Sequence, residues 1–251
     1  MTLYSNIANI SFPSNPNIHY YEYQSIPYPT YLNDVVAVLD SVKKLFSLYF
    51  NTVDDKPLSI INQKPNIDAP QIVYEINTIY LNVSGRYWCQ YIYQFSHEFC
   101  HCMNWGHVVQ PMRWFEESLC ELASHFFLLK SYEKWKVDPP YPNWKDYAEN
   151  ILNYEISSKT DVSNFNIIEL FDSKSAILQS LEKDEYQRSL NKYLALELLP
   201  YFKDSPTLWH IVPKLTSLPN GNSFEENLLL LDKLSNQPIF EIIKNISNSK
   251  K

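Results

Sequence analysis

Glycine is scarce in this chain of 251 residues, which has 3 glycines against 16 prolines, 19 tyrosines and 13 phenylalanines. Many short strands joined by tight turns need glycine at positions with positive φ, so this composition favours helices over an all-β fold. Basic runs are also missing, and the net charge is −7. A polyanionic partner selects a basic surface, so we expect no nucleic acid and no anionic membrane among the partners.

Long apolar stretches and targeting signals are missing as well. No run of 18 apolar residues occurs, so we expect no transmembrane helix. The N-terminal residues MTLYSNIANISFPSNPN have neither a basic region nor an apolar core, so we expect no signal peptide. Cysteine is limited to Cys89, Cys100, Cys102 and Cys120. We expect reduced, buried thiols in a cytoplasmic protein, and the alternative is that some of them ligate zinc.

Apolar periodicity predicts a mixed first part and a helical second part. The Pro-, Asn- and Tyr-rich residues 1–30 are expected to be irregular, and helical spacing predicts a helix over 31–50. Three β-type runs follow, at 57–62, 71–76 and 78–83. Helices are expected after them, over 87–103, 113–132, 143–157, 165–182, 184–203, 206–217 and 223–247.

These elements predict an α+β fold, in which a small mixed sheet and an active-site helix precede a mainly helical lobe. The segment PPYP at 139–142 is the expected boundary between the two parts. We therefore expect an N-terminal region of residues 1–138 and a helical C-terminal subdomain of residues 139–251.

The clearest chemical signal is HEFCH at residues 97–101, an H-E-x-x-H motif inside the helix expected over 87–103. His97 and His101 are four residues apart, so a helix places both rings on one face, close enough to bind one ion. Glu98 projects beside them and can reach a metal-bound water without ligating the metal. A zinc peptidase needs this arrangement, in which zinc acidifies the water and the carboxylate takes its proton.

The sequence before the motif adds a resemblance. The β-type run 78–83, a short gap and a helix with H-E-x-x-H together resemble the zincin fold of metallopeptidases. The resemblance implies that the strand before the helix lies at the sheet edge. It also implies that this edge pairs with extended peptide substrate, as in β-augmentation. An ordinary edge strand without this function is the alternative.

A catalytic zinc needs a third protein ligand, and two candidates are available. The stretch HEFCHCMNWGH at 97–107 resembles the metzincin signature H-E-x-x-H-x-x-G-x-x-H, with His107 in the last position. Asn104 replaces the glycine of that signature and adopts positive φ less easily. Met112 follows His107 too closely for the methionine turn of that family.

The second candidate lies in RWFEESLCELAS at 113–124, which resembles the glutamate helix of gluzincins, the thermolysin and aminopeptidase branch. The resemblance implies that Glu117 is the third zinc ligand, although Ser118 replaces the usual glycine. It also implies that Glu121, four residues on, hydrogen-bonds a zinc-bound histidine and fixes the orientation of its ring. Glu116 points about 100° away on the helix and is the least favoured third ligand.

A weaker resemblance lies in YQRSLNKYLALELL at 186–199, which is similar to the Y-x-K-G opening of a helix in aminopeptidases. It implies that Tyr186 donates its hydroxyl to the oxyanion, with Arg188 and Ser189 replacing the Lys and Gly. A tyrosine that only packs is the alternative. The G-x-M-E-N strand of aminopeptidases is missing, so exopeptidase action is not supported.

The sequence therefore predicts a zinc metallopeptidase of the gluzincin type that acts on a peptide or protein. Zn²⁺ would be held by His97, His101 and Glu117, and Glu98 would be the general base. One alternative is a metzincin-type peptidase that uses His107. The other is a zincin-like module that binds a peptide or protein without catalysis, which the presence of Glu98 disfavours because a structural site gives it no role.

Overall fold

A computed structural model describes residues 7–23, 32–50, 56–64 and 66–249 of the chain. By their internal packing these residues form two compact units. The first unit extends to Phe99 and also includes Phe127–Glu155, and the second contains Cys100–Phe126 and the residues from Ile156 onward. The chain thus crosses between the two units at three points, and each point lies inside a continuous helix. The regional boundary expected at residues 138–139 stays a prediction.

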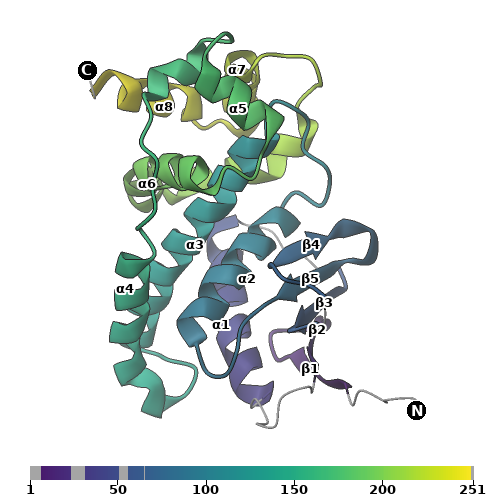
Figure 1. The fold of residues 1–251 in the computed structure, drawn as a ribbon. Helices are drawn as coiled ribbons and strands as arrows, with labels where there is room; N and C mark the ends of the chain where they lie inside the picture. The colour runs from purple at the N-terminus through teal and green to yellow at the C-terminus, as the bar shows by residue number, and fades with distance from the viewer. Residues whose placement is uncertain (1–6, 24–31, 51–55, 65, 250–251) are drawn as a thin grey trace. The chain divides into compact units, whose positions relative to one another are not determined.

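The first unit contains a five-stranded mixed sheet in the order β1-β2-β3-β5-β4 (Figure 1). The central strands β2, β3 and β5 run parallel, whereas β1 and β4 are the antiparallel outer strands. Their bounds are Ile7–Phe12 for β1, Asn15–Tyr23 for β2, Leu58–Asn62 for β3, Gln71–Val73 for β4 and Thr78–Leu81 for β5. The predicted α+β class with a small mixed sheet is confirmed.

Two expectations about the sheet are wrong. Residues 7–23 were expected to be irregular, but they form β1 and β2, while 1–6 and 24–30 lie outside the described residues. Ile18, Tyr20 and Glu22 alternate with less buried residues, and this period of two outweighs the prolines at 13 and 16. Strand β5 is not an edge strand either, because it pairs with β3 on one side and with β4 on the other.

Helices α1 (Leu32–Phe50) and α2 (Trp88–Cys102) lie on the same side of this sheet (Figure 1). Their contact is aromatic: Phe46 of α1 meets Phe99 of α2 edge to face, with ring centroids 5.0 Å apart. Phe46 also stacks on Phe127 of α3 (Arg113–Trp135) at 3.8 Å. Burying large rings removes apolar surface from water, which fixes α2 against its neighbours before any ligand is bound.

The remaining elements of the first unit are short. A 3-10 turn, η1 (Tyr74–Ile76), follows β4 where strand was expected. A second one, η2 (Pro142–Tyr147), leads into α4 (Ala148–Ser157) and follows the predicted break at 139–142. The helices predicted over 31–50, 87–103 and 113–132 are confirmed as α1, α2 and α3.

The second unit is helical, as predicted, but more divided than its periodicity indicated. Its elements after α4 are η3 (Ile167–Phe171), α5 (Ala176–Lys183), α6 (Arg188–Asp204), η4 (Pro206–Ser217), α7 (Phe224–Ser235) and α8 (Ile239–Ser249). The segment predicted as one helix over 223–247 breaks because Asn236 is left-handed, with φ of 55°, and Pro238 follows. The core of the second unit includes Trp209, whose ring meets those of Phe126 and Phe202 edge to face.

No helix in the described part of the chain is long and apolar enough to cross a membrane. All four cysteines, Cys89, Cys100, Cys102 and Cys120, are buried and free, as expected from the sequence. Cys120 of α3 and Cys100 of α2 interact, and burial together with this neighbour raises the pKa of the Cys120 thiol well above its usual value. The Cys120 thiol is therefore a protonated packing group rather than a thiolate ligand.

Candidate metal site

Helix α2 presents His97 and His101 on one face, as their spacing of four residues requires. Its other faces are apolar, with Tyr91, Ile92, Phe95 and Phe99 buried. His101 is buried and His97 is half-buried. The burial of the helix on its aromatic side therefore fixes which way the two imidazoles point.

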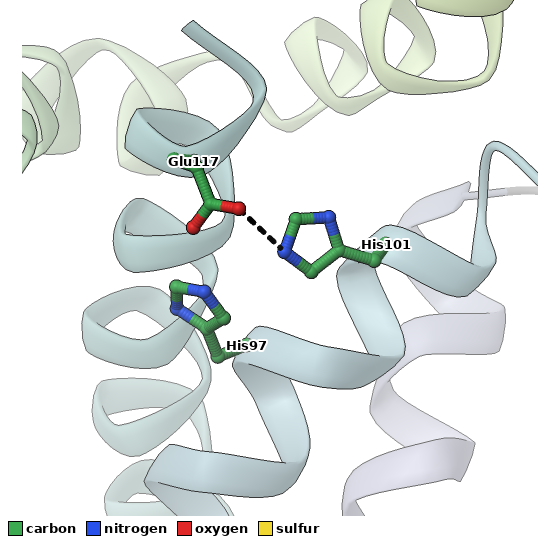
Figure 2. Close-up of side chains that lie close together, drawn as sticks. All are labelled: His97, His101 and Glu117. Carbon is green, nitrogen blue, oxygen red and sulfur yellow. Dashed lines mark ion pairs between the residues drawn. The ribbon is translucent and has the colours of Figure 1, made fainter. Parts of the chain in front are cut away.

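Helix α3 brings Glu117 to the same place (Figure 2). His97, His101 and Glu117 each offer one ligand atom, and these three atoms lie within 4.8 Å of one another. The Nε2 atom of His101 is 3.4 Å from Oε1 of Glu117. Two histidines and one carboxylate are a ligand set that catalytic zinc sites use.

The spacing of these atoms fits a metal ion. Tetrahedral zinc with ligands at 2.0–2.2 Å holds its ligand atoms roughly 3.3–3.6 Å apart. The His101–Glu117 pair at 3.4 Å lies in that range. The limit of 4.8 Å for the whole group shows that His97 needs only a small adjustment to join them. The residues present therefore fit a tripodal metal site.

A second carboxylate fixes the His101 ring. The Nδ1 atom of His101 lies 3.1 Å from Oε1 of Glu116, and Asn104 Nδ2 donates to the same oxygen at 2.8 Å. A hydrogen on Nδ1 leaves the lone pair on Nε2, the atom that faces Glu117. Two acceptors so close repel each other unless a cation or a proton lies between them. The site is thus prepared for positive charge.

The role of Glu116 was missed by the sequence reasoning, which treated it only as the least favoured ligand. The resemblance gave the task of orienting a histidine to Glu121 instead. Glu121 is buried, lies 3.5 Å from Nε2 of His125 and is 3.9 Å from Nζ of Lys192. Whether it also orients a ligating histidine stays a prediction. The signal available in the sequence was that Glu116 directly precedes Glu117 and that Asn104 follows the end of α2 by two residues.

His107 is exposed in the loop between α2 and α3 and does not belong to the group of close ligand atoms found in the described residues. The left-handed residue of this loop is Trp105, with φ of 44°, and not Asn104, which stands at the glycine position of the metzincin signature. Asn104 is instead the amide that binds Glu116. These observations favour Glu117 over His107 as third ligand.

Glu98 and Tyr186 have contrasting surroundings. Glu98 follows His97 on α2 and is 5% exposed. Tyr186 is 66% exposed and lies in the turn before α6, which begins at Arg188 and not at residue 184 as expected. The backbone N–H of Tyr186 donates to Oδ1 of Asp184, which shapes this turn. The catalytic roles of both residues stay predictions.

Comparison with models of known protein families gives no match, and comparison with curated proteins gives no related sequence. The function of this chain is therefore inferred from its own H-E-x-x-H motif and from the geometry of His97, His101 and Glu117.

Proposed function

We propose that the protein is a zinc-dependent metallopeptidase that hydrolyses peptide bonds. The observation that carries the proposal is the approach of His97, His101 and Glu117, from two helices, to within 4.8 Å. The consecutive helices α2 and α3 bring together two imidazoles and a carboxylate, which is a ligand set that catalytic zinc sites use. Zinc bound there would lower the pKa of a water at its open position and polarise the substrate carbonyl.

Glu98 is the proposed general base. It directly follows His97 on α2 and is almost fully buried, and this role requires its carboxylate to face the attacking water. A carboxylate in that position takes a proton from the attacking water and then delivers it to the leaving amine. A structural metal site would not need an acid at residue 98, so this residue favours catalysis over the non-catalytic alternative.

Tyr186 is the proposed oxyanion donor, and the contacts of its turn support this role. Arg113 Nη1 lies 3.7 Å from Oε1 of Glu185, and Asn191 Nδ2 donates to the Glu185 carbonyl at 2.7 Å. Arg113 and Glu117 are four residues apart on α3 and therefore share one face of that helix. The turn that carries Tyr186 is thus tied to the face of α3 that presents Glu117.

Peptide substrate would pair with β4 rather than β5. The resemblance assigned this role to an edge strand, and β5 has partners on both sides. Strand β4 is the outer strand of the sheet on the side of β5, with Gln71 exposed and Ile72 and Val73 half-buried. An open edge offers unpaired backbone N–H and C=O groups to an extended peptide.

The test combines metal content with turnover. Zinc-loaded protein and its Glu98→Gln variant are compared by native mass spectrometry and against a diverse library of fluorogenic peptides. We expect about one zinc per chain in both proteins and cleavage by the wild type alone, because the amide has no basic oxygen for the proton. Zinc binding without cleavage of any library peptide would favour the non-catalytic module. No zinc in either protein would refute the proposal.

A further inference from the structure

A pocket lies in the first unit, away from the metal site. Its volume is about 670 Å³, within the range of roughly 300–1,000 Å³ that small-ligand sites occupy. The start of α1, the N-terminus of α2, η2 and α4 all contribute to it. Trp88 of its lining is nine residues before His97 on α2, which at 1.5 Å per residue is about 13.5 Å along the helix. The pocket is therefore separate from the ligand group.

The wall of this pocket is a fixed aromatic stack. Trp144 stacks on Trp88 with centroids 5.1 Å apart and on Trp135 with centroids 5.7 Å apart. Tyr141 meets Trp144 edge to face at 4.7 Å. The indole faces of Trp144 are thus used within the protein, and Trp88, Tyr141 and Trp144 line the pocket. Since the rings are already ordered, a ligand loses little free energy in ordering them.

The rim is polar and carries both signs of charge. Asn143, Asp146 and Asn150 are exposed at the pocket, and Arg86 lies 4.0 Å from Asp34. Two amides, two carboxylates and one guanidinium offer donors and acceptors side by side. The two carboxylates and one guanidinium sum to a single negative charge. The pocket therefore has no strong field of one sign.

These features exclude three ligand classes. An anion such as a phosphate would meet two carboxylates. A quaternary ammonium is best bound by several open ring faces, but the faces of Trp144 are covered, which leaves the Tyr141 ring, and Arg86 adds a like charge. A wholly apolar ligand would desolvate the rim amides and carboxylates without replacing their hydrogen bonds. A neutral ligand with adjacent hydroxyl groups and an apolar flank satisfies every group.

We propose that this pocket binds a neutral saccharide of one or two rings. Vicinal hydroxyls both donate and accept, so they match the planar side chains of Asn143, Asp146 and Asn150. The C–H flank of the sugar packs on the Tyr141 ring and the edges of the Trp144 stack. This binding is independent of the proposed peptidase activity and of metal, because none of the lining residues belongs to the ligand group.

The experiment measures saturation-transfer difference NMR on the full chain with a panel of free hexoses, N-acetylhexosamines and disaccharides. Tetramethylammonium chloride and inorganic phosphate serve as contrasting probes. Asn150→Ala and Asp146→Ala test the rim, and Asn153→Ala is the matched control because it is exposed on the same helix but does not line the pocket. Each sample is measured with zinc and with chelator.

We expect saturable binding of at least one saccharide, equal with and without zinc, and weakened roughly tenfold by each rim variant but not by the control. Each rim variant removes a hydrogen bond to the saccharide, and this loss accounts for the weaker binding. The proposal is overturned if no saccharide binds with Kd below about 10 mM. Binding that the rim variants leave unchanged also overturns it, as does saturable binding of tetramethylammonium or phosphate in its place.

Discussion

Helix α2 carries two buried polar clusters that differ in how their hydrogen bonds are used. The first joins the helix to the sheet: Tyr91 of α2 accepts from Asn62 Nδ2 at 2.9 Å, and Asn62 also donates to Glu22 at 3.3 Å. Tyr20 donates its hydroxyl to Glu22. The second is the group of His97, His101 and Glu117. Both contain a carboxylate among aromatic or imidazole rings.

The sheet cluster is closed. Asn62 is bound at both ends, because its Nδ2 donates to the Val83 carbonyl at 2.8 Å and its Oδ1 accepts from the Val83 N–H at 3.0 Å. Burial, with smaller contributions from Tyr91 and Glu22, raises the pKa of Tyr20 well above its usual value. Its phenol therefore stays a donor to the Glu22 carboxylate. Tyr20 and Asn62 both donate hydrogen bonds to the Glu22 carboxylate, so this carboxylate needs no ligand.

In the second cluster, ligand atoms from two helices converge on one point. With Nδ1 of His101 bound to Glu116, the Nε2 lone pair faces the Glu117 carboxylate at 3.4 Å. Acceptor facing acceptor is stable only with a cation or a proton between them. Burial of a carboxylate alone therefore does not identify a metal site. A candidate metal site is identified instead by ligand atoms that lie close enough together to hold one ion.

The largest change in zinc affinity is expected when one of the three proposed ligands is removed. Glu117→Ala should lower zinc affinity by orders of magnitude, since it removes one of three ligands. His107→Ala is the matched control and should leave the affinity nearly unchanged, because His107 lies outside the group. Competition with a chromogenic chelator measures both constants. The reverse ranking of the two variants would establish the metzincin-type alternative.

The next comparison is between Tyr186, the proposed oxyanion donor, and Tyr20 of the sheet cluster. Tyr186→Phe should lower kcat by roughly 10²–10³ with KM, zinc content and stability unchanged, because an oxyanion donor acts only in the transition state. Tyr20→Phe should lower stability and leave kcat per folded molecule unchanged. Steady-state kinetics and denaturant unfolding separate the two. Near-normal kcat in Tyr186→Phe would show that Tyr186 is a surface residue and that another group stabilises the oxyanion.

The third prediction distinguishes the two acids assigned to histidine orientation. Glu116→Gln should weaken zinc binding on the order of 10–100-fold, because it removes the charge that holds the Nδ1 hydrogen of His101. Glu121→Gln should have a comparable effect only if Glu121 orients His97. The same chelator competition gives both values. An unchanged affinity in Glu116→Gln would mean that Asn104 and packing suffice to hold the ring.

The smallest change in zinc affinity is expected from a substitution in the sheet cluster. Glu22→Gln should lower the free energy of unfolding by about 1–3 kcal/mol, since a buried network loses a charged acceptor. Zinc affinity should stay the same. Glu149→Gln, an exposed acid of α4, is the control and should change neither quantity. A loss of zinc affinity in Glu22→Gln would contradict the separation of the two clusters along α2.

The parts of the fold and of the candidate site that depend on residues close together in the sequence could be predicted from it. Helices α1, α2 and α3 follow from apolar periodicity, and the shared face of His97 and His101 follows from 3.6 residues per turn. The strands over 7–23 were missed because their prolines and asparagines outweighed the alternation of Ile18, Tyr20 and Glu22. The interior place of β5 was missed because strand order depends on pairing between distant segments, which periodicity does not record.

The sequence by itself determined the H-E-x-x-H helix, the class of the fold and the short list of third ligands. Only the tertiary structure decided that Glu117 approaches the two histidines and that Glu116 holds the Nδ1 atom of His101. Residues 97 and 101 are placed by the hydrogen bonds of one helix, so their relation is fixed locally. Glu116 and Glu117 adjoin on α3, and the packing of α3 beside α2 decides which carboxylate faces which atom of the ring.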